Sequence, residues 1–92
     1  MNDQLVGYLL DINLQGMMLV GMEAVKSGTL FQLKMMLPEK IAGKDHLLVE
    51  ASSRWCKKNT RNDWYEIGFQ ILKIAREDLE IIREHFLPDS FV

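Results

Sequence analysis

The stretch Gly7–Val20, with the sequence GYLLDINLQGMMLV, constrains the fold more than any other part of the chain. It places an apolar arm on each side of a polar corner, Asp11–Gly16. Residues 8–12 alternate as in a strand, and Met17–Val20 is continuously apolar, as in a strand buried on both faces or lying at an oligomer contact. Short β-prone runs that are joined through Asp and Asn and end on Gly predict two strands meeting at a tight bend.

Three further runs downstream have the alternation of strands. Thr29–Leu37 alternates apolar and polar residues, and Pro38 is expected to end it because proline lacks a backbone donor. Glu39–Asp45 is then expected to be a polar loop. His46–Lys57 and Trp64–Leu72 alternate in the same way. The residues between these two runs, NTRND, hydrogen-bond their own backbone readily, so the two runs are predicted to form an antiparallel hairpin.

The alternation also predicts which side chains face the core. Expected inward are Phe31, Leu33, Met35 and Leu37 in the first run, Leu47, Val49, Ala51, Ser53 and Trp55 in the second, and Tyr65, Ile67, Phe69 and Ile71 in the third. Expected outward are Gln32, Lys34, Glu50, Ser52 and Arg54. Gly68, in the middle of a run, indicates a bend or a close approach of the backbone to another group.

The last quarter of the chain changes to a helical period. Ala75, Leu79, Ile82 and Phe86 fall on one helical stripe. Glu77 and Asp78 stand in the first turn, where negative charge is favourable, and Pro88 is expected to end the helix.

Several short strands followed by one helix, in 92 residues with 48% hydrophobic composition, predict a single domain over residues 1–92. The strand spacing favours an antiparallel barrel or sandwich, with the helix able to cover an open end.

Composition excludes several classes of function. A net charge of −2 gives no general attraction to nucleic acid or to an anionic membrane. No apolar run approaches the roughly 20 residues of a membrane-spanning helix, and we expect a cytoplasmic protein. Cys56 is the only cysteine, and His46 and His85 lack metal-binding spacing, so neither a metal nor a cofactor is expected. No nucleophile–base pair, catalytic carboxylate pair or phosphate loop is recognisable, so we expect no enzyme.

Short motifs across nearly the whole chain occur in the order of one known family. Gly7–Gly16 fits the pattern G-x-x-x-D-x-S-x-x-G, except that Asn13 stands at the serine position. The other matching pieces are Gly28–Leu33, Leu37-Pro38, Val49–Trp55, Ile67–Phe69 and Arg76–Leu79. Together they resemble a PilZ domain. The resemblance implies a small antiparallel β-barrel with a C-terminal α-helix, and a non-enzymatic bacterial signalling module that acts on motility, pili or exopolysaccharide systems.

Many PilZ domains bind cyclic di-GMP, and the resemblance implies a site in two parts. An R-x-x-x-R pair before the first barrel strand binds phosphates and guanine faces, and the D-x-S-x-x-G corner binds guanine edges. Carried over to this chain, the corner assigns Asp11, Asn13 and Gly16 as ligand-binding residues. The alternative is structural, with the corner held by Asx hydrogen bonds and a left-handed glycine.

The chain departs from the family pattern in its arginines. Arg54, Arg61, Arg76 and Arg83 are the only four, no R-x-x-x-R occurs, and none precedes Asp11. The first strand of the family also has no counterpart, since ten residues precede Asp11. Either the sequence is an N-terminally truncated or abbreviated PilZ domain, or it has diverged from messenger binding. Weak or lost cyclic di-GMP binding is therefore expected.

Two further surfaces remain open to interpretation. The basic group Arg54, Lys57, Lys58 and Arg61 either substitutes for the missing arginines, touches an anionic partner, or is a solvated hairpin end. Met17–Val20 would be an uncovered apolar edge if the first barrel strand is absent, which predicts a homodimer or higher oligomer, with Phe86-Leu87 and Phe91-Val92 also available for the contact. An adaptor that acts through protein–protein contacts without nucleotide is the alternative function.

Overall fold

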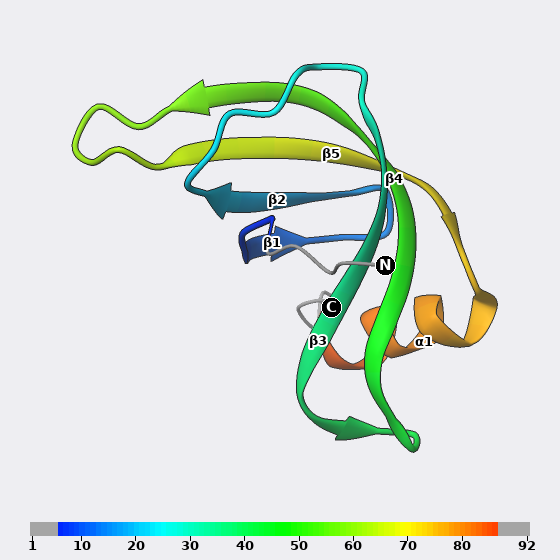
Figure 1. The fold of residues 1–92 in the computed structure, drawn as a ribbon. Helices are drawn as coiled ribbons and strands as arrows, with labels where there is room; N and C mark the ends of the chain where they lie inside the picture. The colour runs from blue at the N-terminus through cyan, green and yellow to red at the C-terminus, as the bar shows by residue number, and fades with distance from the viewer. Residues whose placement is uncertain (1–5, 87–92) are drawn as a thin grey trace, which may run out of the picture.

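The computed structural model describes residues 6–86, and its strands form a strongly curved antiparallel sheet (Figure 1). The elements are β1 (Tyr8–Ile12), β2 (Gly16–Gly21), β3 (Leu30–Ile41), β4 (Lys44–Lys58), β5 (Tyr65–Ile74) and α1 (Arg76–His85). The strand order is β1-β2-β5-β4-β3, and all neighbours are antiparallel. The five strands form a half-barrel with one C-terminal helix, which confirms the predicted fold class.

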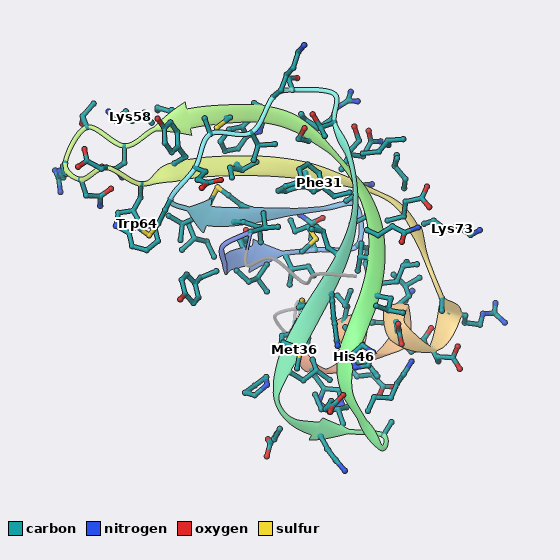
Figure 2. All side chains as sticks on the ribbon, viewed as in Figure 1. Phe31, Met36, His46, Lys58, Trp64 and Lys73 are labelled. Atoms are coloured by element: carbon teal, nitrogen blue, oxygen red, sulfur yellow. The ribbon has the colours of Figure 1, made fainter. Side chains whose placement is uncertain are left out.

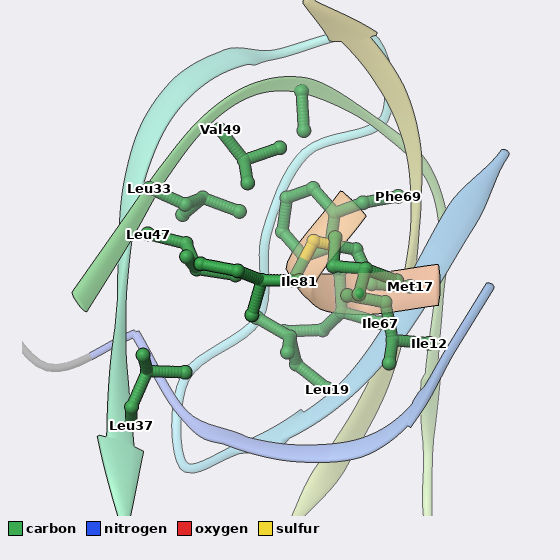
Figure 3. Packing of buried hydrophobic residues seen from close by; sticks show 12 residues of the cluster. Ile12, Met17, Leu19, Leu33, Leu37, Leu47, Val49, Ile67, Phe69 and Ile81 are labelled. Atoms are coloured by element: carbon green, nitrogen blue, oxygen red, sulfur yellow. The ribbon is translucent and has the colours of Figure 1, made fainter. Parts of the chain in front are cut away.

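The core fills the concave side of the half-barrel and is closed by α1 (Figure 3). Every strand contributes to it, and so does the helix. Its buried residues are Ile12, Met17, Leu19, Leu33, Leu37, Leu47, Val49, Ala51, Ile67, Phe69, Ile81 and Ile82. Phe31 and Phe69 meet edge to face, with ring centroids 5.4 Å apart. The inward faces predicted for β3 and β5 are confirmed, because those residues are buried or half-buried.

The predicted hairpin between β4 and β5 is also confirmed. Asn59 N–H donates to the carbonyl of Trp64 at 2.8 Å, and the side chains of Asn59 and Asn62 accept backbone N–H groups within the tip. Figure 2 shows Lys58 and Trp64 at this end of the sheet, away from Met36 and His46 at the end where β3 turns into β4.

The prediction that Pro38 ends the third strand is wrong. β3 continues to Ile41, and the expected loop over residues 39–45 shrinks to the turn at Ala42 and Gly43. Both turn residues have positive φ, 52° and 79°, as a two-residue type I′ hairpin requires. Pro38 is tolerated because β3 lies at the end of the strand order and the β3–β4 register is interrupted between Met36 and Ile41.

The predicted alternation of β4 fails at two residues, Ser52 and Trp55, and a β-bulge explains the second of them. Trp55, expected inside, is 44% exposed, and Ser52, expected outside, is 8% exposed. The register of β4 with β5 shifts between Ser53 and Trp55, because Arg54 is an extra residue without an opposite partner. Such a β-bulge reverses the facing of the residues that follow it.

The helix packs as an amphipathic element with a stripe slightly different from the predicted one. Ile82 is buried as expected, but Ile81 and Asp78 are buried beside it. Lys44 forms an ion pair with Asp78, which also accepts a hydrogen bond from Leu48 N–H at 3.3 Å. The role predicted for Pro88 lies outside the described residues, as do the contacts predicted for Leu87, Phe91 and Val92.

Met17–Val20 is not an uncovered edge, contrary to prediction. β2 lies between β1 and β5 and pairs with both, and Met17 and Leu19 are core residues. Within residues 6–86 the strands with a partner on one side only are β1 and β3. None of the helical structure in that part of the chain has the length and apolar character needed to cross a membrane.

Candidate functional site

The corner between β1 and β2 is built around the side chain of Asn13. Its Oδ1 accepts hydrogen bonds from the backbone N–H groups of Gln15 (2.8 Å) and Gly16 (2.9 Å), and Asn13 N–H donates to the Gly16 carbonyl at 2.9 Å. The carbonyl of Gln15 accepts from Ile71 N–H at 2.8 Å, which ties the corner to β5. The Asx hydrogen bonds expected at this corner are therefore present, and the side-chain amide N–H groups of Asn13 are the part of the side chain left for a ligand.

Gly16 is required for a different reason from the one predicted. It does not have the left-handed conformation; the positive-φ glycines of the described chain are Gly28 and Gly43. A Cβ at residue 16 would instead lie 2.7 Å from the carbonyl oxygen of Phe69, closer than side-chain carbons approach a backbone oxygen. Glycine is needed because β2 and β5 come close together at the corner.

The register of four strands places the corner in a row across the outer face of the sheet. Asp11 is opposite Met18, Met18 is opposite Gly68, and Gly68 is opposite Trp55. Paired residues in a sheet point to the same face. The neighbouring row, Ile12, Met17, Phe69 and Ser53, is buried in the core. The row from Asp11 to Trp55 therefore faces outward.

A shallow hollow of about 230 Å³ lies along this row. It is lined by Asp11, Asn13, Gly16, Met17, Met18, Arg54, Trp55, Gly68 and Phe69. The structure thus brings together all three residues predicted from the family motif. The hollow is smaller than the roughly 300–1,000 Å³ of pockets that enclose a drug-sized ligand, so it has room for part of a ligand such as one base.

Trp55 forms one wall of the hollow. Its indole ring covers Gly68 so closely that a Cβ on that glycine would overlap Cε2 and Nε1 of the ring. The close approach predicted at Gly68 is confirmed, with the Trp55 side chain as the approaching group. The indole of Trp55 therefore packs against Gly68, while 44% of the residue remains exposed to solvent.

Arg54 is the basic residue that the fold brings to the corner. Of the predicted basic group, Arg54 lines the hollow, whereas Lys57, Lys58 and Arg61 do not. Its backbone carbonyl accepts a hydrogen bond from Ser27 Oγ at 2.8 Å. From the sequence, Arg54 was one of four basic residues that could substitute for the missing arginines, whereas strict alternation placed Trp55 in the core. The sequence signal that could have indicated the hollow is a glycine in one strand, Gly68, together with an aromatic residue in the strand that is predicted to pair with it.

A second, larger hollow of about 600 Å³ lies where β1 begins. It is lined by Val6, Gly7, Tyr8, the segment 21–26, Thr29, Phe31 and Trp64. The rings of Tyr8 and Trp64 lie 6.3 Å apart on its rim. Its lining is mainly apolar and includes none of the predicted ligand-binding residues.

Two side chains with displaced pKa values lie near the β3–β4 turn, away from both hollows. The hydrogen bond to Asp78 raises the pKa of Lys44, and the hydrogen bond with His46, at 2.7 Å, lowers the pKa of Asp45. Among residues 6–86 no three His, Cys, Asp or Glu side chains lie together as metal ligands would.

Comparison with known proteins identifies the family. A family model described as PilZ domain matches residues 1–87, almost the entire chain. The searches of curated proteins and of solved structures gave no match. The family match covers all of the described elements, and its implied function is that of a cyclic di-GMP receptor-like signalling module. The chain therefore belongs to the PilZ domain family.

Proposed function

We propose that this protein is a non-enzymatic, cytoplasmic signalling module of a bacterium that binds cyclic di-GMP weakly. The observation that carries the proposal is the hollow on the outer face, where Asp11, Asn13 and Gly16 stand beside Arg54 and Trp55. The carboxylate of Asp11 accepts from the N–H groups of guanine, and the lack of a side chain at Gly16 permits close approach of the ligand.

Weak affinity follows from the missing R-x-x-x-R pair. Hydrogen bonds to charged groups contribute about 1.5–3 kcal/mol each. Losing two of them lowers affinity by roughly 100-fold or more. Weak binding is therefore sought over dissociation constants from about 10 μM to about 1 mM, which correspond to about −7 to −4 kcal/mol.

Calorimetric titration of the full chain with cyclic di-GMP tests this function. Binding in that range, abolished by Asp11→Ala, is the expected result. Asp63→Ala removes an exposed carboxylate at the hairpin tip, far from the corner, and serves as the matched control that leaves binding unchanged. No heat of binding at about 1 mM ligand would show that the domain is not a nucleotide receptor.

An adaptor working through protein contacts is the second candidate, and the exposed residues of β1 favour it. Tyr8 is 57% exposed and Leu10 is 53% exposed on a strand paired only with β2 in the described chain, and Met22 nearby is 71% exposed. Exposed apolar residues on an edge strand are typical of strand addition by a partner or a second copy.

The oligomeric state separates this candidate from a monomeric receptor. Light scattering after size exclusion at micromolar concentration should give a dimer or larger species that Leu10→Lys converts to a monomer. A strictly monomeric mass for the unmodified chain would exclude the homodimer.

A further inference from the structure

We infer that a second copy of this chain pairs with the start of β1 across a two-fold axis, and that the residues around the 600 Å³ hollow of each copy form the contact. The inference rests on the adaptor candidate, whose partner and contact surface it names, and it does not depend on cyclic di-GMP. A two-fold contact uses the same surface on both copies, so this surface has to be complementary to itself.

The two edge strands of the described sheet differ in how they are protected against pairing. β3 carries Lys34, Pro38 and Lys40, and lysine and proline on an edge strand hinder the addition of another strand. β1 and the two residues before it contain neither lysine nor proline. The bulge at Leu10 interrupts β1, so the part of the edge that is open to pairing is residues 6–9. Strand addition is therefore expected at the start of β1 and not at β3.

The start of β1 is held in place by a close crossing over the end of β2. A Cβ on Gly7 would overlap the carbonyl oxygen of Val20, and a Cβ on Gly21 would overlap the carbonyl oxygen of Val6. Glycine is needed at both positions because the two backbones come so close together. An edge that is already fixed loses little conformational freedom when another strand pairs with it.

An exposed apolar rim lies beside this edge. Tyr8 and Met22 line the hollow and are both exposed, and the ring of Tyr8 lies 6.3 Å from that of Trp64. The hollow also borders residues 6–8, so a strand that pairs with this edge would lie across the rim. Removing the rim from water favours the contact in both copies at once.

The charges at the hollow favour a second copy as the occupant. Glu23 and Lys26 both line it, both are exposed, and neither forms an ion pair within residues 6–86. The backbone of Lys26 is fixed, because its carbonyl accepts hydrogen bonds from Ser53 Oγ at 2.6 Å and Thr29 Oγ1 at 2.7 Å. A two-fold axis brings the glutamate of each copy toward the lysine of the other. A partner of a single charge would instead meet one of these two residues unfavourably.

Met22→Lys tests which surface makes the contact. It places a charge on the apolar rim, so the variant should be monomeric by light scattering after size exclusion, at a micromolar concentration where the unmodified chain is dimeric. Met36→Lys is the matched control, because Met36 is similarly exposed but lies on the protected edge strand β3, at the other end of the sheet from Trp64 (Figure 2). It should remain dimeric. Dissociation by Met36→Lys and not by Met22→Lys would overturn the inference.

An exchange of charges tests whether the partner is a second copy. Glu23→Lys and Lys26→Glu each place like charges across the axis. Sedimentation equilibrium should show a dimer dissociation constant raised by about 2- to 30-fold for each variant alone, since two exposed ion pairs are lost. An equimolar mixture of the two variants forms a heterodimer in which both pairs are again of opposite charge. The mixture should therefore associate about as tightly as the unmodified chain, and a mixture no tighter than either variant alone would contradict the inference.

The outcomes separate this inference from the functions proposed above. If the unmodified chain is dimeric but Met22→Lys stays dimeric and mixing restores nothing, the inference is wrong and the adaptor candidate stands. A strictly monomeric unmodified chain would contradict both, and the calorimetric titration would still test the receptor function independently. Thermal unfolding identifies any variant that fails to fold, and the two charge variants, at exposed positions, then decide the result.

Discussion

Asn13 holds the β1–β2 corner with one side-chain oxygen, and it is also one of the proposed ligand-binding residues. Asn13→Ala removes the acceptor for the N–H groups of Gln15 and Gly16. Because both bonds are exposed to solvent, the free energy of unfolding should fall by about 1 kcal/mol. Asn13→Asp keeps the acceptor and should lose less. Urea unfolding of the two variants checks this, and equal losses would contradict the hydrogen-bonding role.

Ala42 is strained by its turn and offers a stabilising substitution. It has φ of 52°, a left-handed conformation that costs a residue with a Cβ roughly 1–2 kcal/mol. Asn is the residue preferred before Gly in a type I′ turn. Ala42→Asn should therefore raise the free energy of unfolding by about 0.5–1 kcal/mol, measured by urea denaturation. Ala24→Asn, at an exposed position without positive φ, is the control; an equal gain there would remove the turn as the explanation.

The sequence predicted half of the candidate site, and the reason lies in individual residues. Asp11, Asn13 and Gly16 are close in sequence, so a motif could name them before their geometry was known. Arg54 and Trp55 join them through strand pairing over more than thirty residues and through a bulge. Nothing in the run from Leu47 to Trp55 breaks the alternation, so the extra residue has no local signal.

At the scale of elements, α1 closes the half-barrel chiefly through Ile82. Its side chain is fully buried, at 0% exposure, so Ile82→Ala removes apolar contacts and leaves a cavity. The free energy of unfolding should fall by about 2–5 kcal/mol. Glu84→Ala, on the exposed side of the same helix, should change it by less than about 0.5 kcal/mol. Chemical denaturation of both variants checks the difference; a small effect of Ile82→Ala would mean that the helix does not close the core.

The ion pair between Lys44 and Asp78 ties the β3–β4 hairpin to the helix and should make stability depend on alkaline pH. The hydrogen bond to Asp78 raises the pKa of Lys44 above its ordinary 10.5. A raised pKa means that the stabilisation is fully present below 10.5 and is lost as pH rises through the higher folded-state value. Unfolding of the unmodified chain and of Lys44→Met, compared from about pH 9 to about pH 12, should show a stability difference that shrinks with pH. A constant difference would contradict the pairing.

Element type was predictable because burial on one face imposes alternation, and this was sufficient for β3, β5 and the hairpin tip. The lengths of the elements could not be predicted in the same way. Proline is a strong signal within a central strand, but Pro38 lies in an edge strand at an irregular register, where no ladder hydrogen bond depends on it. The short turn at Ala42-Gly43 lacks the Asn-Gly signal that would have marked it.

At the scale of the whole molecule, the five strands enclose the core only on one side, and the outer face carries the hollow. This division explains why residues that alternate along β2 and β5 serve two purposes. Met17 and Phe69 fill the core, while Met18 and Gly68 form the floor between Asp11 and Trp55. Asp11 lies in β1, which is an edge strand of the described sheet. Ligand binding and strand addition by a partner would therefore occur at neighbouring positions.

The location of the site on β1, β2, β5 and β4 is tested most directly by amide and indole chemical shifts of the full chain during titration with cyclic di-GMP. Shift changes should centre on residues 11–16, Arg54, Trp55 and Gly68, with the Trp55 indole N–H moving and that of Trp64 unchanged. Assignment of the two indoles follows from Trp64→Phe. Changes confined to Tyr8, Met22 and Trp64, or no changes at about 1 mM ligand, would contradict the proposed site.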